Sequence, residues 1–136
     1  MANAIYPKYK EAAISGGANV NLSTGDVRII LIDTNDYVYS AAHEFLSSVP
    51  GAARVATLTA GVTSKTVTDG VFDCANFSWT SVTGDQSEAI IVYIHTGSDS
   101  TARLVTYLDT GISGLPVTPN GQDIDFTVNP SGLFAL

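Results

Sequence analysis

The side chains that could carry chemistry in this chain are few and widely spaced. The two histidines, His43 and His95, lie far apart in sequence, and Cys74 is the single cysteine. A zinc site needs three or four nitrogen or sulfur ligands, usually with two of them close together. We therefore predict no zinc site, and a single cysteine excludes a disulfide within the chain.

Two groups of carboxylates could act on a cation or a substrate. The turn Asp33-Thr-Asn-Asp36 offers oxygens to calcium, whereas Asp123 and Asp125 project from one face of a predicted strand. Calcium needs six or more oxygen ligands, and polar turns of this composition are common. Paired acids catalyse only when their environments separate their pKa values, and the apolar opposite face of that strand favours a solvated role for these two. The sequence predicts no catalytic residue, no metal, no cofactor and no enzyme.

Charge and hydropathy exclude two classes of partner. Six Lys and Arg against thirteen Asp and Glu give a net charge of −7, and the basic residues form no cluster. A nucleic-acid partner needs a basic protein surface, and an anionic membrane repels an acidic protein. We therefore expect neither a nucleic acid nor a membrane as a partner. No apolar run approaches the roughly 20 residues of a membrane span, and no signal peptide is recognisable, which fits synthesis in the cytoplasm.

The elements that must position any site are mainly strands. Two runs rich in β-branched and aromatic residues, 89–94 and 102–109, flank a polar loop containing Gly97, which predicts a hairpin. The first run is apolar at every position, so both faces of that strand are expected to be covered. This hairpin is the predicted centre of the domain.

Further strands and two short helices follow from the same patterns. Apolar or alternating runs predict strands at 27–33, 54–59, 66–73 around the turn Asp69-Gly70, 76–82, 122–129 and 133–136. Pro7 and the pair Gly16-Gly17 delimit a helix at 6–14, with an extended arm as the alternative, and residues 41–48 predict one helical turn. We predict an all-β domain spanning 1–136, an antiparallel β-sandwich or compact barrel of about seven to eight strands. An N-terminal arm or helix (1–22) precedes its β core (23–136).

Several stretches resemble a family of small virion structural proteins encoded by tailed bacteriophages. The similarity runs in order over nearly the whole chain, and its most specific parts are Gly84-Asp-Gln-Ser-Glu-Ala89 and Gly114-Leu-Pro-Val-Thr-Pro-Asn-Gly121. Other matching stretches are 1–6, 33–37, 43–50, 54–55 and 65–67. The chain departs from the family at Gly16-Gly-Ala-Asn-Val-Asn-Leu22, where family members carry a longer, more acidic segment that contains Trp.

The resemblance implies a capsid decoration, or cement, protein of mainly β architecture. Such a protein binds the outer surface of the assembled head, usually as a homotrimer, and stabilises the shell. Its partners would be the major capsid protein and its own copies, and its location would be the virion, after synthesis in the bacterial host cytoplasm. Two alternatives remain open: a neck, tail or baseplate component, and a glycan-binding virion module with Trp79 or Tyr107 as an exposed stacking platform.

We expect the shell contacts to come from the N-terminal segment, especially Tyr6, Pro7 and Tyr9, because a short polar-aromatic lead is free to order on a partner. Deleting residues 2–9 should then abolish capsid binding and leave the fold intact. A second group of expected contacts is the loop around Asp36, Tyr37 and His43.

Overall fold

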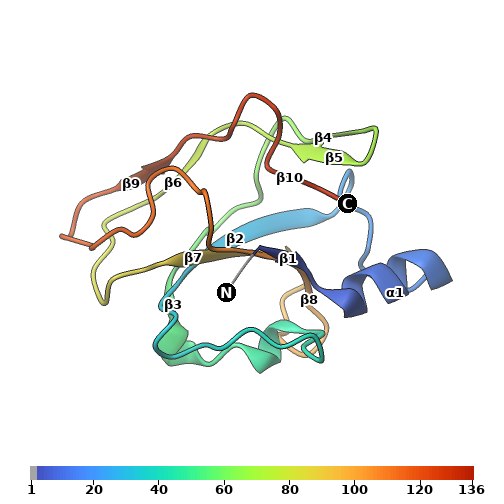
Figure 1. Cartoon of the computed structure of the whole chain (residues 1–136), viewed down its shortest axis with the longest axis horizontal. Helices are drawn as coiled ribbons and strands as arrows, with labels where there is room; N and C mark the ends of the chain where they lie inside the picture. Colours follow the sequence, from blue (N-terminus) through green and yellow to red (C-terminus); the bar gives the residue numbers. More distant parts are fainter. Residues whose placement is uncertain (1–2) are drawn as a thin grey trace.

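The computed structural model describes residues 3–136, which form antiparallel strands with one short α-helix at the side of the molecule (Figure 1). In chain order the elements are β1 (Ala4–Ile5), α1 (Pro7–Ser15), β2 (Asp26–Ile32), the 3₁₀ helices η1 (Leu46–Ser48) and η2 (Gly51–Ala53), β3 (Arg54–Thr57), β4 (Thr66–Thr68), β5 (Val71–Asp73), β6 (Phe77–Trp79), β7 (Ala89–His95), β8 (Arg103–Leu108), β9 (Ile124–Phe126) and β10 (Phe134–Ala135).

A five-stranded sheet in the order β1-β8-β7-β2-β3 forms the middle of the molecule. The predicted hairpin is confirmed: β7 and β8 pair antiparallel, with Ile91 opposite Tyr107. Strand β2 pairs with β7 along its whole length, from Asp26 opposite His95 to Ile32 opposite Ala89. All residues of β8, and those of β7 from 89 to 94, are buried. Both faces of this sheet are therefore covered.

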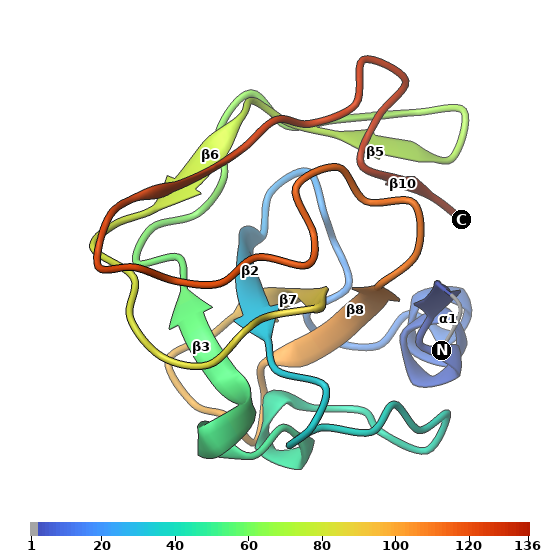
Figure 2. The same ribbon diagram turned by 60° about the vertical axis from the view of Figure 1, so that its left-hand side comes forward.

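Two small sheets, β10-β5-β4 and β6-β9, cover one face of the central sheet (Figures 1 and 2). Strands β4 and β5 are joined by the predicted turn, in which Asp69 (φ 51°) and Gly70 (φ 79°) both adopt the left-handed conformation of a tight hairpin. The Trp79 indole N–H donates to the Ile29 carbonyl of β2 at 3.1 Å, which fixes this layer on the sheet. The β-sandwich is confirmed, with additional strands of two or three residues.

The other face is covered by residues 33–53, the connection from β2 to β3, which we call the covering segment (Figure 2). The helical turn predicted at 41–48 is only partly correct, because 3₁₀ structure begins at Leu46. Phe45 instead forms an isolated antiparallel bridge with Arg103, and the Leu104 N–H donates to the Glu44 carbonyl at 3.0 Å. Pairing with β8 overrides the local helical pattern.

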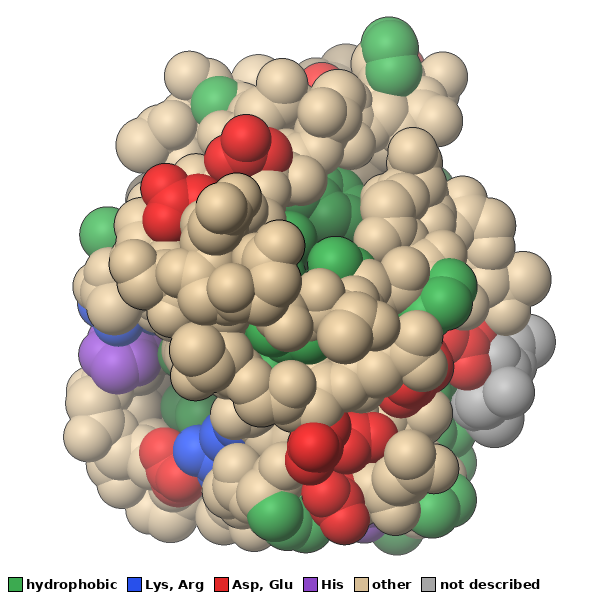
Figure 3. All heavy atoms as spheres, turned by 90° about the vertical axis from the view of Figure 1, so that its left-hand side faces the viewer, with side chains coloured by type: hydrophobic (Ala, Val, Ile, Leu, Met, Phe, Trp, Pro, Cys, Tyr) green, Lys and Arg blue, Asp and Glu red, His purple; other side chains and the backbone are tan. Residues whose placement is uncertain are grey.

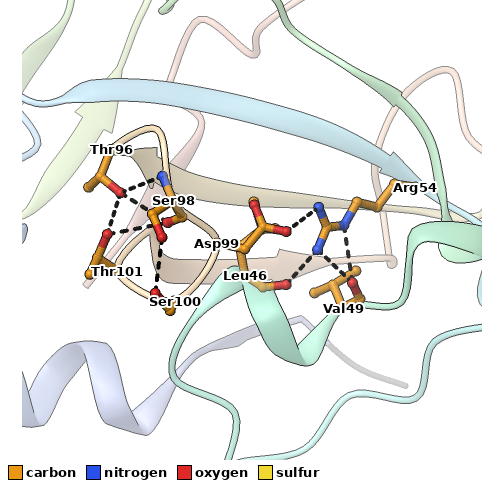
Figure 4. A network of polar contacts seen from close by, with 8 residues as sticks. All are labelled: Leu46, Val49, Arg54, Thr96, Ser98, Asp99, Ser100 and Thr101. Atoms are coloured by element: carbon orange, nitrogen blue, oxygen red, sulfur yellow. Dashed lines mark hydrogen bonds and ion pairs between the residues drawn. The ribbon is translucent and has the colours of Figure 1, made fainter.

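Arg54 at the start of β3 fastens the covering segment to the β7–β8 hairpin (Figure 4). Its guanidinium donates to the carbonyls of Leu46 and Val49 at 2.8 and 2.7 Å, and to the Asp99 carboxylate at 2.9 Å. Asp99 belongs to the hairpin loop 96–102. Arg54 thus provides hydrogen bonds to two backbone carbonyls of the covering segment, which contains no β-strand.

The N-terminal residues are part of the core. Helix α1 confirms the predicted helix, with Pro7 in its first turn and Gly16 ending it in the left-handed conformation (φ 72°). The alternative of an extended arm is wrong, because β1 pairs with β8 and the Tyr6 N–H donates to the Val105 carbonyl at 3.0 Å. The buried hydrophobic residues form one cluster that includes Tyr6 and Tyr9.

Gly132 lies where β10 approaches β5, and we expect it to tolerate no side chain. Its φ is +111°, and an added Cβ would overlap Val71 Cγ1 and lie 3.2 Å from the Phe72 carbonyl oxygen. Strain and overpacking together should make Gly132→Ala less stable by roughly 2 kcal/mol in denaturant unfolding. Gly51→Ala is the matched control, because an added Cβ meets nothing within 4 Å there. Equal stability of the two variants would contradict the described packing.

Candidate functional site

A chain of hydrogen bonds links Tyr6 to two aromatic side chains of the covering segment. The Tyr6 and Tyr37 hydroxyls lie 2.7 Å apart, and the Tyr37 hydroxyl lies 2.8 Å from His43 Nδ1. Tyr6 follows β1, whereas Tyr37 and His43 belong to the covering segment. The structure thus brings together three of the six residues that the sequence named as contacts.

Two further tyrosines, Tyr39 and Tyr107, extend this chain into a ring cluster. The ring centroid of Tyr39 lies 5.1 Å from that of Tyr6 and 5.6 Å from that of Tyr107. The rings of Tyr37 and Tyr107 are 6.1 Å apart. All three distances lie in the range that aromatic pairs favour. We call Tyr6, Tyr37, Tyr39 and Tyr107 the tyrosine cluster; Tyr39 is the half-buried member and the other three are buried.

Burial keeps the tyrosine cluster uncharged. It raises the pKa of Tyr37 to about 12. Burial, followed by the neighbouring Tyr37, raises the pKa of Tyr6 far above its usual range. Burial, followed by the Asp109 carboxylate, does the same to the pKa of Tyr107. Desolvation lowers the pKa of His43, which favours a neutral imidazole beside the Tyr37 hydroxyl.

A pocket of about 390 Å³ opens beside the tyrosine cluster. The Glu88 carboxylate at one side of it accepts two hydrogen bonds at 3.0 Å, from the Thr34 N–H and the Thr34 hydroxyl. Val38, with 79% of its surface exposed, stands at the rim. The pocket thus combines aromatic rings, carboxylates and an exposed apolar side chain. Its lining residues are Thr34, Tyr37, Val38, Tyr39, Glu88, Tyr107 and Asp109.

Three carboxylates form a second acidic group near the end of β2. Oxygens of Asp33, Asp36 and Asp85 lie within 4.8 Å of one another. The sequence pointed to the turn that holds Asp33 and Asp36, whereas Asp85 comes from a distant loop that no local pattern connects with it. Three carboxylates fall short of the six or more oxygens that calcium takes.

A groove between β3 and β6 carries no titratable side chain. It measures about 500 Å³ and is lined by residues 55–63 and 76–83. Apart from Gly61 and Asn76, these residues have hydrophobic or hydroxyl-bearing side chains. Figure 3 looks onto the side of the molecule where these strands lie and shows a hollow with hydrophobic side chains on its floor. Several acidic side chains gather below the hollow. The groove itself offers no group for acid–base chemistry.

The N-terminal contact hypothesis is wrong for two of its three residues. Tyr6 is 0% exposed and Tyr9 is 2% exposed, so neither side chain is available to a partner; Pro7 is exposed in the first turn of α1. Deleting residues 2–9 would remove β1 and both buried rings, so we now expect this deletion to destabilise the fold. Of the second group, Asp36 is exposed, His43 is half-buried and Tyr37 is buried.

The idea of an exposed stacking platform is likewise wrong for Trp79 and Tyr107, each of which is 2% exposed. Trp79 packs edge-on against Phe77 and Phe126 as a core residue. The residues that sequence reasoning missed are Tyr39 and Glu88. The alternation Tyr37-Val-Tyr39 was the available signal for the first; nothing local connects Glu88 with either tyrosine.

Comparison with known proteins gives no family. No protein-family model matches the chain, and no curated protein matches it in sequence. Among the described residues, no helix is long and apolar enough to span a membrane.

The hydroxyl chain should contribute measurably to stability. Tyr37→Phe removes the partner of the buried Tyr6 hydroxyl, and we expect it to lower the free energy of unfolding by about 1–3 kcal/mol. Tyr6→Phe and Tyr37→Phe together should cost less than the sum of the single changes, because each removes the same bond. Tyr9→Phe is the control: its hydroxyl donates separately to the Val20 carbonyl at 2.7 Å, so its effect should add to that of Tyr37→Phe. Additive losses for Tyr6 and Tyr37 in denaturant unfolding would refute their coupling.

The same tyrosines predict alkaline unfolding. Their pKa values are raised in the folded chain, so folding opposes ionisation. The resulting stability is fully present below the ordinary tyrosine pKa of about 10 and is lost as the pH rises through the raised values. Phenolate absorbance should therefore appear together with the loss of β-sheet circular dichroism. Full phenolate formation near pH 10 in a protein that keeps its circular dichroism would contradict this account.

Proposed function

We propose that this chain is a capsid decoration protein of a tailed bacteriophage, which binds the outer surface of the assembled head, as a homotrimer, and stabilises it. The primary support is the sequence resemblance described above, which runs over nearly the whole chain. A protein of this kind needs a stable β core and contact surfaces, and it needs no catalytic group.

The observation that carries the proposal concerns the two most specific stretches of the resemblance. They are separated in sequence by β7 and β8, yet they meet in space: the Ser87 N–H donates to the Val117 carbonyl at 2.9 Å, and the Val117 N–H donates to the Ser87 carbonyl at 2.9 Å. Gln86 and Thr118 add a side-chain contact at 3.4 Å. Two matching stretches that pair with each other form one structural unit, which is what a shared fold would preserve.

The proposed stabilisation follows from mass action. A protein that binds the assembled lattice and not its separate subunits lowers the free energy of the assembled state alone. A trimer would need two surfaces on each copy, one for its siblings and one for the shell. Exposed apolar side chains that could contribute to such surfaces are Ile14, Val38, Val67 and Leu136.

Copy number in purified virions tests the proposal. In the phage whose genome encodes this chain, quantitative mass spectrometry against the major capsid protein should give one copy per capsid subunit or a simple fraction of it. A handful of copies per particle would instead indicate a neck, tail or baseplate component. Absence from the virion would refute every virion assignment.

A further inference from the structure

We propose that the pocket beside the tyrosine cluster binds an arginine side chain presented by a different protein. The inference rests on the proposed function for the identity of that protein, which would be the major capsid protein. Its chemistry rests on the pocket alone: an aromatic wall, carboxylates and an apolar rim in a cavity of about 390 Å³.

The charge of the pocket favours a cation. Glu88 and Asp109 both line it, in a chain whose net charge is −7. Burial is the main cause of the raised pKa of Tyr107, and the negative charges of Asp109 and Glu88 raise that pKa further. Burial opposes a charge of either sign, whereas the two carboxylates oppose a phenolate and attract a positive charge.

The geometry favours a guanidinium. Both donors of Thr34 reach a single oxygen, Glu88 Oε1, and a carboxylate has further acceptor sites that can take N–H donors. Tyr39 is half-buried and is held between Tyr6 and Tyr107, so its ring has a fixed orientation at the pocket wall. Arginine stacks on an aromatic face while it binds a carboxylate, a combination that a compact ammonium group matches less well.

The arginine must come from another kind of chain, because the three arginines of this one are already held. Arg28 forms two hydrogen bonds with Asp26. Arg54 binds two carbonyls and Asp99. Arg103 donates to the Ala18 carbonyl and lies over the Phe45 ring. A second copy would also bring a further net charge of −7. The occupant that fits is a basic partner surface, with Val38 adding an apolar contact at the rim.

Glu88→Gln is the decisive variant, because glutamine keeps an acceptor for Thr34 and removes the charge. We expect purified Glu88→Gln to bind assembled shells at least about tenfold more weakly than the wild type, in keeping with the loss of one charged hydrogen-bonded partner. Asp125→Asn, the same chemical change at an exposed position of β9, should bind like the wild type. Tyr39→Leu should weaken binding, and Tyr39→Phe should retain it, because the ring and not the hydroxyl makes the contact.

A second measurement needs no shell. Titration of the labelled protein with the peptide Gly-Arg-Gly, followed by NMR, should shift the backbone signals of Tyr39 and Glu88. The peptide with citrulline in place of arginine, which is neutral and similar in shape, should not shift them, and Glu88→Gln should lose the response. Thermal unfolding of each variant checks that it is folded.

The outcomes separate the two proposals. If the wild-type protein does not bind shells but responds to Gly-Arg-Gly, the decoration function is refuted and the proposal of an arginine-binding pocket stands. Shell binding that Glu88→Gln leaves unchanged, without a response to the peptide, would overturn the pocket and keep the function. Equal shifts with Gly-Lys-Gly would overturn the assignment to arginine.

Discussion

The structure depends on the need to cover both faces of β7. Its residues from 89 to 94 are apolar and buried, so this strand has no side that can meet water. The small sheets provide one cover, but the opposite cover is the irregular covering segment, which leaves its own backbone groups to be satisfied. Arg54 and the bridge between Phe45 and Arg103 meet part of that need. The second face of the central sheet is also too apolar to be exposed, and it is covered by the covering segment, which contains no β-strand.

The tyrosine cluster is a consequence of that irregular layer. Large rings fill the uneven space above β8 and bury much apolar surface, but each buried hydroxyl needs a partner. Tyr6 and Tyr37 satisfy one another, and His43 takes the remaining place at the Tyr37 hydroxyl. Beyond Tyr39 the rings end beside Glu88, and the pocket opens there. The same packing that completes the core therefore leaves a site with aromatic and acidic walls.

Local patterns predicted the elements whose causes are local. Hydrophobic continuity identified β7, the dipeptide Asp69-Gly70 identified its turn, and Pro7 and Gly16 delimited α1. The predictions failed where the local structure is determined by pairing with residues that are distant in the sequence. The predicted helical turn does not form at Glu44 and Phe45, because these two residues pair with β8. Tyr6 looked free to order on a partner because nothing near it in sequence shows that its backbone and hydroxyl are both bonded across the domain.

The candidate site could be predicted only in part for the same reason. Tyr37 and His43 lie on one segment, and the sequence grouped them; Glu88 and Tyr107 reach them only through the order β8-β7-β2 of the central sheet. Glu88 belongs to the stretch 84–89, and it directly follows Ser87, the residue that pairs with Val117. That pairing and the Glu88 N–H bond to the Ile32 carbonyl fix the backbone that positions the carboxylate beside Tyr107. Under the proposed function, the stretch 84–89, on which the expected resemblance rests, is also the stretch that provides the pocket with the charge of Glu88.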